Sequence, residues 1–125
     1  MPLKPLMPPV PERWTLSAGD AATATLTIPA DALRERRFEI ACAITVAVPE
    51  AAPHGASGSS HQMTVQANGA LLWRRRVASQ NPGEWDGLDY RCTRSVPVGH
   101  ALRITVAVAC QGAKRRTLTV EADEV

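Results

Sequence analysis

The stretch Phe38–Val48, FEIACAITVAV, decides the fold class because large apolar residues occupy every second position. Successive side chains of a β-strand point to opposite faces, whereas the apolar face of a helix repeats every three or four residues. The residues between the large ones are Glu, Ala and Thr, which form a milder opposite face. The alternation predicts a strand buried on one face, and that face consists of Phe38, Ile40, Cys42, Ile44, Val46 and Val48.

The same period of two recurs on both sides of this stretch. It is clear in three further segments, 22–28, 102–110 and 117–121, and weaker in four others, 13–17, 61–68, 70–77 and 88–96. Only Asp31–Arg37 resembles a helix, and it is long enough for two turns at most. About eight short strands separated by turn signals are typical of an antiparallel sandwich. We predict a single all-β sandwich, either a jelly roll, which is preferred, or an immunoglobulin-like Greek key.

The length of 125 residues fits one domain, which can bury a core without disulfides or metals. Residues 1–12 are rich in proline and predict an extended arm, and residues 13–125 form the predicted sandwich. The arm has no continuous apolar stretch, so it does not resemble a secretory signal, and we expect a cytoplasmic protein. Pro49–Ser60 and Gln80–Gly87 are predicted loops because turn-forming residues gather in them.

Charge and apolar patterning argue against two classes of partner. The 14 basic residues exceed the 12 acidic ones by only two, and aromatic residues make up 4% of the chain. Surfaces that bind nucleic acid usually combine a larger positive excess with a series of aromatic residues. No apolar run approaches the roughly 20 residues that a membrane helix needs. We therefore expect no nucleic-acid partner and no membrane partner.

The chain carries no recognisable catalytic motif: HExxH, GxSxG, P-loop and GxGxxG patterns are all missing from the sequence. The histidines fall in or beside predicted loops and turns, where we expect solvated side chains: His54, His61 and His100. The cysteines lack metal-ligand spacing and fall on apolar strand faces, which indicates buried free thiols: Cys42, Cys92 and Cys110. We predict no catalytic residue, no metal site and no cofactor.

The pair Asn68-Gly69 predicts a hairpin between two strands, because both residues adopt positive φ easily. A two-residue turn would pair Thr64 with Trp73 and bury the face that carries Met63 and Val65. The other face would then expose an indole beside amide and guanidinium groups, as Gln62, Thr64, Gln66, Leu71, Trp73 and Arg75. Such a group suits a protein interface or the apolar face of a sugar. Alternatively, a register shift of one residue sends Trp73 into the core, or another segment covers it.

A second group of candidate contact residues lies in the predicted loop before the sixth strand: Glu84, Trp85, Asp86 and Asp89. Their carboxylates could bind a hard cation, but the spacing matches no EF-hand, and a solvated loop paired with nearby arginines is the simpler interpretation. The run Arg74–Arg76 is typical of a sheet edge, where charge discourages aggregation. Together with Arg115 and Arg116 it could instead form a patch for an anionic ligand.

These observations predict a non-enzymatic recognition or assembly module that binds a protein partner or associates with itself. One alternative is a lectin-like domain that binds a glycan through Trp73. The other is a small enzyme with a site in the two long loops, which would need His54 or His61 close to Glu84, Asp86 or Asp89.

Overall fold

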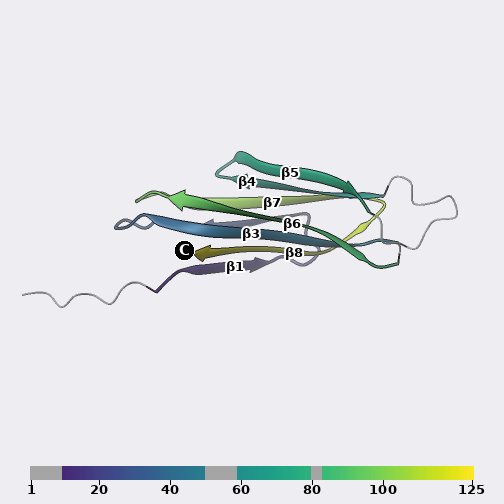
Figure 1. Ribbon diagram of the computed structural model, residues 1–125, viewed down its shortest axis with the longest axis horizontal. Coiled ribbons are helices and arrows are strands. Elements are labelled where there is room, and N and C mark those ends of the chain that lie inside the picture. The colour runs from purple at the N-terminus through teal and green to yellow at the C-terminus, as the bar shows by residue number, and fades with distance from the viewer. Residues whose placement is uncertain (1–9, 50–58, 80–82) are drawn as a thin grey trace, which may run out of the picture.

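The computed structural model describes residues 10–49, 59–79 and 83–125, and all regular structure in these ranges is β-strand (Figure 1). Accordingly, none of the described residues belongs to a helix with the length and apolar character needed to cross a membrane. The chain order of the strands is β1 (Arg13–Ser17), β2 (Thr23–Ile28), β3 (Arg36–Ala47), β4 (Ser60–Ala67), β5 (Ala70–Ala78), β6 (Trp85–Val96), β7 (Leu102–Gln111) and β8 (Lys114–Glu124).

The strands form two antiparallel four-stranded sheets that lie face to face, with the orders β1-β8-β3-β6 and β2-β7-β4-β5. The first strand pairs with the last, the second with the seventh, the third with the sixth and the fourth with the fifth. In addition, β3 pairs with β8 and β4 pairs with β7, and these pairings join the four antiparallel pairs into two sheets. The arrangement is a jelly roll, so the predicted sandwich and the preferred topology are both confirmed.

The core lies between the sheets and contains the large alternating residues of the central strands. Phe38, Ile40, Ile104 and Val106 are fully buried, as the period of two predicts. Burying each side chain of this size contributes roughly 1.5–3 kcal/mol. The opposite faces of the same strands carry Thr, Ala and charged residues toward solvent.

The predicted helix at Asp31–Arg37 is wrong. The Asp31 carboxylate accepts the backbone N–H groups of Leu33 at 2.8 Å and Arg34 at 3.1 Å, which makes a local turn, and β3 begins at Arg36. An Asp side chain that binds nearby backbone N–H groups competes with helix formation. For the residues that follow, backbone pairing of β3 with its two neighbours, β6 and β8, favours a strand over a helix.

The predicted loop Gln80–Gly87 extends too far, because β6 begins at Trp85 and so includes Asp86 and Gly87. Asp86 and Gly87 pair with Val46 and Thr45 of β3. Because β3 extends to Ala47, it provides pairing partners for β6 as far back as Trp85. Gly87 suits this position because a Cβ there would lie 2.8 Å from the Ile44 carbonyl oxygen. The glycine therefore permits a close approach of two strands.

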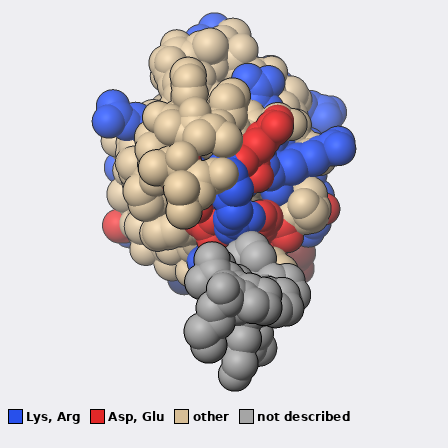
Figure 2. Space-filling view, turned by 90° about the vertical axis from the view of Figure 1, so that its left-hand side faces the viewer, with Lys and Arg blue, Asp and Glu red and all other residues tan. Residues whose placement is uncertain are grey.

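An ion-pair network joins the two ends of the described chain at the left-hand end of Figure 1. Arg34 donates hydrogen bonds to both Glu12 and Glu124. Arg36, whose side chain is 2% exposed, donates to Glu12 at 2.9 Å and to the Pro29 carbonyl at 2.7 Å. The hydrogen bond from Arg34 lowers the pKa of Glu124 from its ordinary 4.5 to about 2. Figure 2 looks onto this end, where acidic and basic side chains alternate at the surface.

Candidate functional site

A β-bulge places Trp73 differently from the predicted register. The turn at Asn68-Gly69 has the expected positive φ values of 49° and 82°, and Gln66 pairs with Leu71 as predicted. The next pair is Val65 with Trp73, so β5 contains one extra residue, Leu72. A bulge moves every following side chain to the opposite face of the strand. Trp73 and Arg75 therefore leave the polar outer face, which corrects the predicted grouping.

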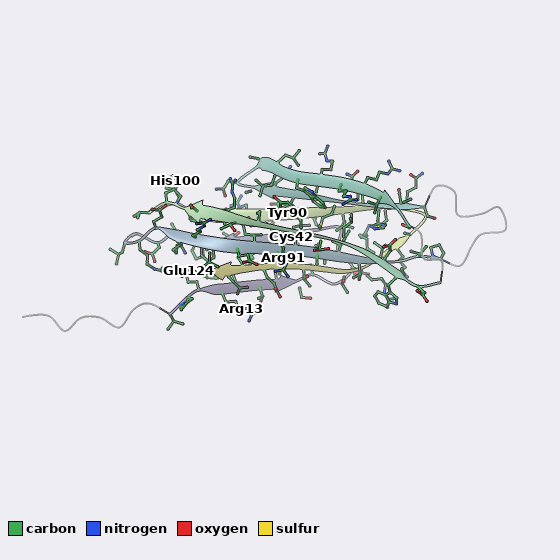
Figure 3. The ribbon with its side chains drawn as sticks, in the orientation of Figure 1. Arg13, Cys42, Tyr90, Arg91, His100 and Glu124 are labelled. Carbon is green, nitrogen blue, oxygen red and sulfur yellow. The ribbon has the colours of Figure 1, made fainter. Side chains whose placement is uncertain are left out.

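Trp73 instead closes one side of the sandwich. It is half-buried against the core, and its ring stacks on that of Tyr90 with centroids 5.0 Å apart and an interplanar angle of 20°. The two residues come from β5 and β6, which are the edge strands of the two sheets. Figure 3 shows Tyr90 beside its register partner Cys42 on β3. Trp73 is thus a packing residue between the sheets, as the alternative of a one-residue register shift predicted, and it does not lie on the outer face.

The outer face that remains on β4 and β5 is polar and shallow. Gln62, Thr64 and Gln66 are half-buried, and the side chain of Leu71 is 54% exposed. After the bulge, Arg74 and Arg76 share this face, opposite Thr64 and Gln62. Their strand is a sheet edge, the position for which the arginine run is typical.

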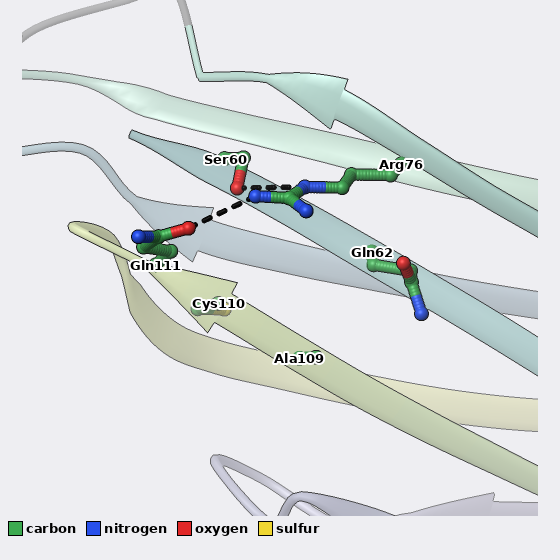
Figure 4. A pocket seen from close by; sticks show the side chains of 6 residues that line it. All are labelled: Ser60, Gln62, Arg76, Ala109, Cys110 and Gln111. Carbon is green, nitrogen blue, oxygen red and sulfur yellow. Dashed lines mark hydrogen bonds between the residues drawn. The ribbon is translucent and has the colours of Figure 1, made fainter. Parts of the chain in front are cut away.

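Arg76 lies at a hollow of about 340 Å³ at the end of this face (Figure 4). Its Nε donates to Ser60 Oγ at 3.1 Å and its Nη2 donates to Gln111 Oε1 at 2.9 Å. These partners are neutral, so they orient the guanidinium without neutralising its charge. Cys110 also borders the hollow.

Trp85 is the exposed tryptophan of the described chain. It is 53% exposed at the start of β6, in the layer opposite the Arg76 hollow. The guanidinium carbon of Arg116 lies 4.4 Å from the centroid of its ring. A hollow of about 300 Å³ surrounds the pair, lined by Asp20, Trp85, Lys114, Arg115, Arg116 and Thr117.

The register of β6, β3 and β8 explains how this group assembles. Trp85 and Lys114 both pair with Ala47, one from each side of β3. The pairing of β3 with β8 shifts between Thr45 and Val46, so that Arg116 is an extra residue in β8. Bulges commonly re-aim a side chain in this way. Arg116 reaches across β3 to the indole, and the β3 residue between Trp85 and Lys114 is the small Ala47.

The charges in the Trp85 hollow are mostly positive. Arg115 donates from Nε to the Asp20 carbonyl at 2.9 Å, which leaves its terminal nitrogens for other partners. Within residues 10–49, 59–79 and 83–125, no carboxylate lies at ion-pair distance from Lys114, Arg115 or Arg116. The Asp20 side chain supplies the single acidic group of the lining.

The carboxylates of the predicted acidic loop do not converge. Asp86 and Asp89 point to opposite faces of β6, because they are three positions apart along the strand. Glu84 is exposed, and Arg91 pairs with Glu39 at 3.2 Å. Among the residues with described positions, no group of three or more His, Cys, Asp or Glu residues could hold a metal ion.

His61 is not the solvated loop histidine that the sequence predicts. It is fully buried in β4, and its Nδ1 forms a 2.8 Å hydrogen bond with Ser79 Oγ. In the described part of the chain its Nε2 has no partner, and no hydrogen bond joins it to Glu84, Asp86 or Asp89. His100 is exposed in the turn before β7 (Figure 3), and His54 lies outside the described residues.

The three cysteines are free, as predicted. Cys42 is buried, and burial raises the pKa of its thiol to about 12. Cys92 and Cys110 are half-buried, and burial also raises the pKa of Cys110. Thiols that stay protonated are poor nucleophiles, which fits a packing role for Cys42.

Comparison with known proteins gives a structural neighbour with a similar fold. No protein-family model matches the chain, and no curated protein matches it. The fold is similar to part of the crystal structure of dimeric latent PorU from Porphyromonas gingivalis, with a TM-score of 0.53 and 13% sequence identity. The match covers 91% of this chain and 13% of that one, so this chain corresponds to a small part of its length. At this identity the likeness concerns the fold alone.

Sequence reasoning named Trp85 and, separately, Arg115 and Arg116, but it did not place them side by side. Residues 117–121 show the alternation of β8, whereas the first residues of the strand, Lys114–Arg116, do not. The run of three basic residues followed by alternating Thr was the available signal. It could not indicate Trp85 as a neighbour, because that contact crosses β3 and depends on a bulge.

Proposed function

We propose that this chain is a non-enzymatic recognition or assembly module that binds a protein partner through the hollow around Trp85. The observation that carries the proposal is an exposed indole with a guanidinium over its ring, set in a concave surface. Trp and Arg are the residue types most enriched at the energetic centres of protein interfaces. The proposal moves the anchoring role from Trp73, which packs between the sheets, to Trp85.

The geometry favours a protein over a sugar as the occupant. A glycan site usually offers an open aromatic face on which a sugar ring can stack, whereas Arg116 already covers one face of Trp85. A sugar stacking on that face would have to displace the guanidinium. A protein partner can contact the exposed part of the ring and hydrogen-bond to the same arginine, so the guanidinium does not have to be displaced.

Site-specific photo-crosslinking tests the proposal in the cells that make the protein. A photoreactive phenylalanine derivative replaces Thr117, which lines the hollow, and in a control chain it replaces Thr27 on the outer face of the other sheet. We expect a discrete protein adduct from position 117 that disappears when Trp85→Ala is added. A second copy of this chain in the adduct would support the assembly version.

Binding of the identified partner then provides the quantitative test. Purified partner should bind the wild-type chain saturably and the Trp85→Ala variant at least about tenfold more weakly, which corresponds to about 1.4 kcal/mol. The same adducts from positions 117 and 27, or unchanged affinity in the variant, would refute the proposal. Binding of a glycan that depends on Trp85, with no protein adduct, would replace it with the lectin-like function.

A further inference from the structure

We propose that the partner presents an acidic, extended peptide segment to the basic end of the sandwich. This inference rests on the proposed function and names the chemistry that the same site recognises. The basic end is defined by four residues, Arg76, Lys114, Arg115 and Arg116, and it lies where β7 turns into β8. Figure 1 shows this turn at the right-hand end, opposite the ion-pair network.

Uncompensated positive charge is the first argument. At the left-hand end, Arg34 and Arg36 are neutralised by Glu12 and Glu124. At the basic end, Arg76 and Arg115 bind neutral side-chain or backbone oxygens instead, and Arg116 lies over the ring of Trp85. The fold therefore pairs its arginines with carboxylates at one end, whereas none of the four cations of the basic end has a carboxylate partner among the described residues. A surface of one sign attracts a partner of the opposite sign and raises its association rate.

The orientation of the guanidinium groups is the second argument. Arg116 lies over the indole of Trp85. The N–H donors of a guanidinium lie in its own plane, so they remain available at its edge when its face contacts an aromatic ring. Arg115 is held through Nε alone, so both terminal nitrogens can reach a carboxylate. Arg76 is fixed by Ser60 and Gln111. Side chains that are already oriented lose less conformational entropy on binding a carboxylate.

The continuity of the hollows is the third argument. A small hollow lined by Asp20, Cys110, Ala113, Lys114 and Arg115 lies between the Trp85 hollow and the Arg76 hollow. It shares Lys114 and Arg115 with the first and Cys110 with the second. The path leads from one sheet past the β7–β8 turn to the other sheet. Since the sheets of a sandwich are about 10 Å apart, on the order of six to eight extended residues would span it.

A protein segment fits this path better than a phosphate polymer. The chain has a net charge of +2, and Asp20 lies in both hollows on the Trp85 side. A continuous phosphate backbone would meet repulsion at Asp20, and nucleic-acid binding normally requires a larger positive excess. An acidic segment can place an apolar or hydrogen-bonding residue at Trp85 and carboxylates at the arginines.

Fluorescence anisotropy with defined probes tests the inference on the full chain. The probe is a fluorescein-labelled decapeptide with six Asp or Glu residues, and the control peptide carries Asn and Gln in their places. We expect saturable binding of the acidic peptide that is at least about tenfold tighter than that of the control and weakens as salt is raised. Equal binding of the two peptides, or no binding of either, would overturn the inference.

Matched variants assign the binding to the basic end. The double variant R115A/R116A should weaken peptide binding at least about tenfold. The double variant R37A/R103A removes the same number of charges from exposed positions at the other end of the sandwich, and it should bind within about twofold of the wild-type chain. Equal losses in both variants would show attraction by net charge alone and would refute the site. Circular dichroism checks that both variants remain folded.

Two competitors and the crosslinking result separate the remaining outcomes. A ten-nucleotide oligothymidylate or an acidic oligosaccharide that binds more tightly than the peptide, and that depends on Arg115 and Arg116, would overturn the choice of a peptide. If the Trp85-dependent adduct forms while the acidic peptide fails, the acidic segment is refuted and the proposed function stands. If the peptide binds and no Trp85-dependent adduct forms, the proposed protein partnership fails.

Discussion

Replacing Trp73 and Trp85 in turn by alanine separates the packing tryptophan from the exposed one. Complete removal of a buried Trp side chain costs about 3–5 kcal/mol. Trp73 is half-buried and also loses its ring stack on Tyr90, which by itself is worth about 0.5–1.5 kcal/mol. We therefore expect Trp73→Ala to lower the free energy of unfolding by about 2 kcal/mol.

Trp85→Ala is the matched control. Trp85 is 53% exposed, and its contact with Arg116 is a surface cation–π pair worth roughly 0.5–1 kcal/mol. We expect a loss below about 1 kcal/mol. A domain of this size loses roughly 4 °C of Tm per kcal/mol, so the two variants should differ by several degrees.

Urea unfolding followed by circular dichroism gives both free energies, and iodide quenching of fluorescence gives the exposure of each ring. Quenching should fall in Trp85→Ala and rise in Trp73→Ala, because removing the shielded ring leaves a larger share of the emission accessible to iodide. A double-mutant cycle of Trp73→Ala with Tyr90→Ala should give a coupling energy of about 1 kcal/mol. If Trp85→Ala costs more than Trp73→Ala, or if the cycle gives no coupling, the bulged register of β5 and the stack between the sheets are wrong.

The other predictions concern the ion-pair network and the glycine of β6. Replacing Arg36 by Met should cost about 3 kcal/mol in urea unfolding, because it leaves a partly buried carboxylate with fewer partners, whereas Arg37→Met at an exposed position should change stability by less than about 0.5 kcal/mol. Because Arg34 lowers the pKa of Glu124 from 4.5 to about 2, the folded state binds this proton less readily than the unfolded state. Its contribution is present above pH 4.5 and is lost as the pH falls toward 2; Glu124→Gln should flatten the plot of unfolding free energy against pH in this window, and parallel curves for wild type and variant would contradict the assignment. Gly87→Ala should lower the unfolding free energy by roughly 1–3 kcal/mol, because its Cβ would lie 2.8 Å from a backbone carbonyl of β3, and an unchanged Tm would refute the close approach.

The fold could be predicted to a large extent because each central strand buries one face. Along Phe38–Val48 the large residues all lie on one face of the strand, and this face is the buried one. The alternation is therefore visible in the sequence without knowledge of which strands lie beside it. The same reasoning located the hairpin at Asn68-Gly69, whose positive φ values are a local property.

The candidate site could be predicted only in part, because bulges carry no clear sequence signal. The bulge at Leu72 turned Trp73 inward, and the irregularity opposite Thr45 brought Arg116 over Trp85. Both irregularities are properties of the pairing between two strands and not of one strand alone. His61 shows the same limit, since it follows a loop-like stretch but is buried by pairing in the middle of its sheet.

The amino-acid order alone determined that this protein consists of strands with one apolar face, since side-chain alternation follows from backbone geometry within each strand. Tertiary structure decided that Trp73 packs between the sheets, that Trp85 is exposed, and which basic residues gather around Trp85. Those outcomes depend on contacts between strands far apart in the chain, where a register shift of one residue moves a side chain from the core to the surface.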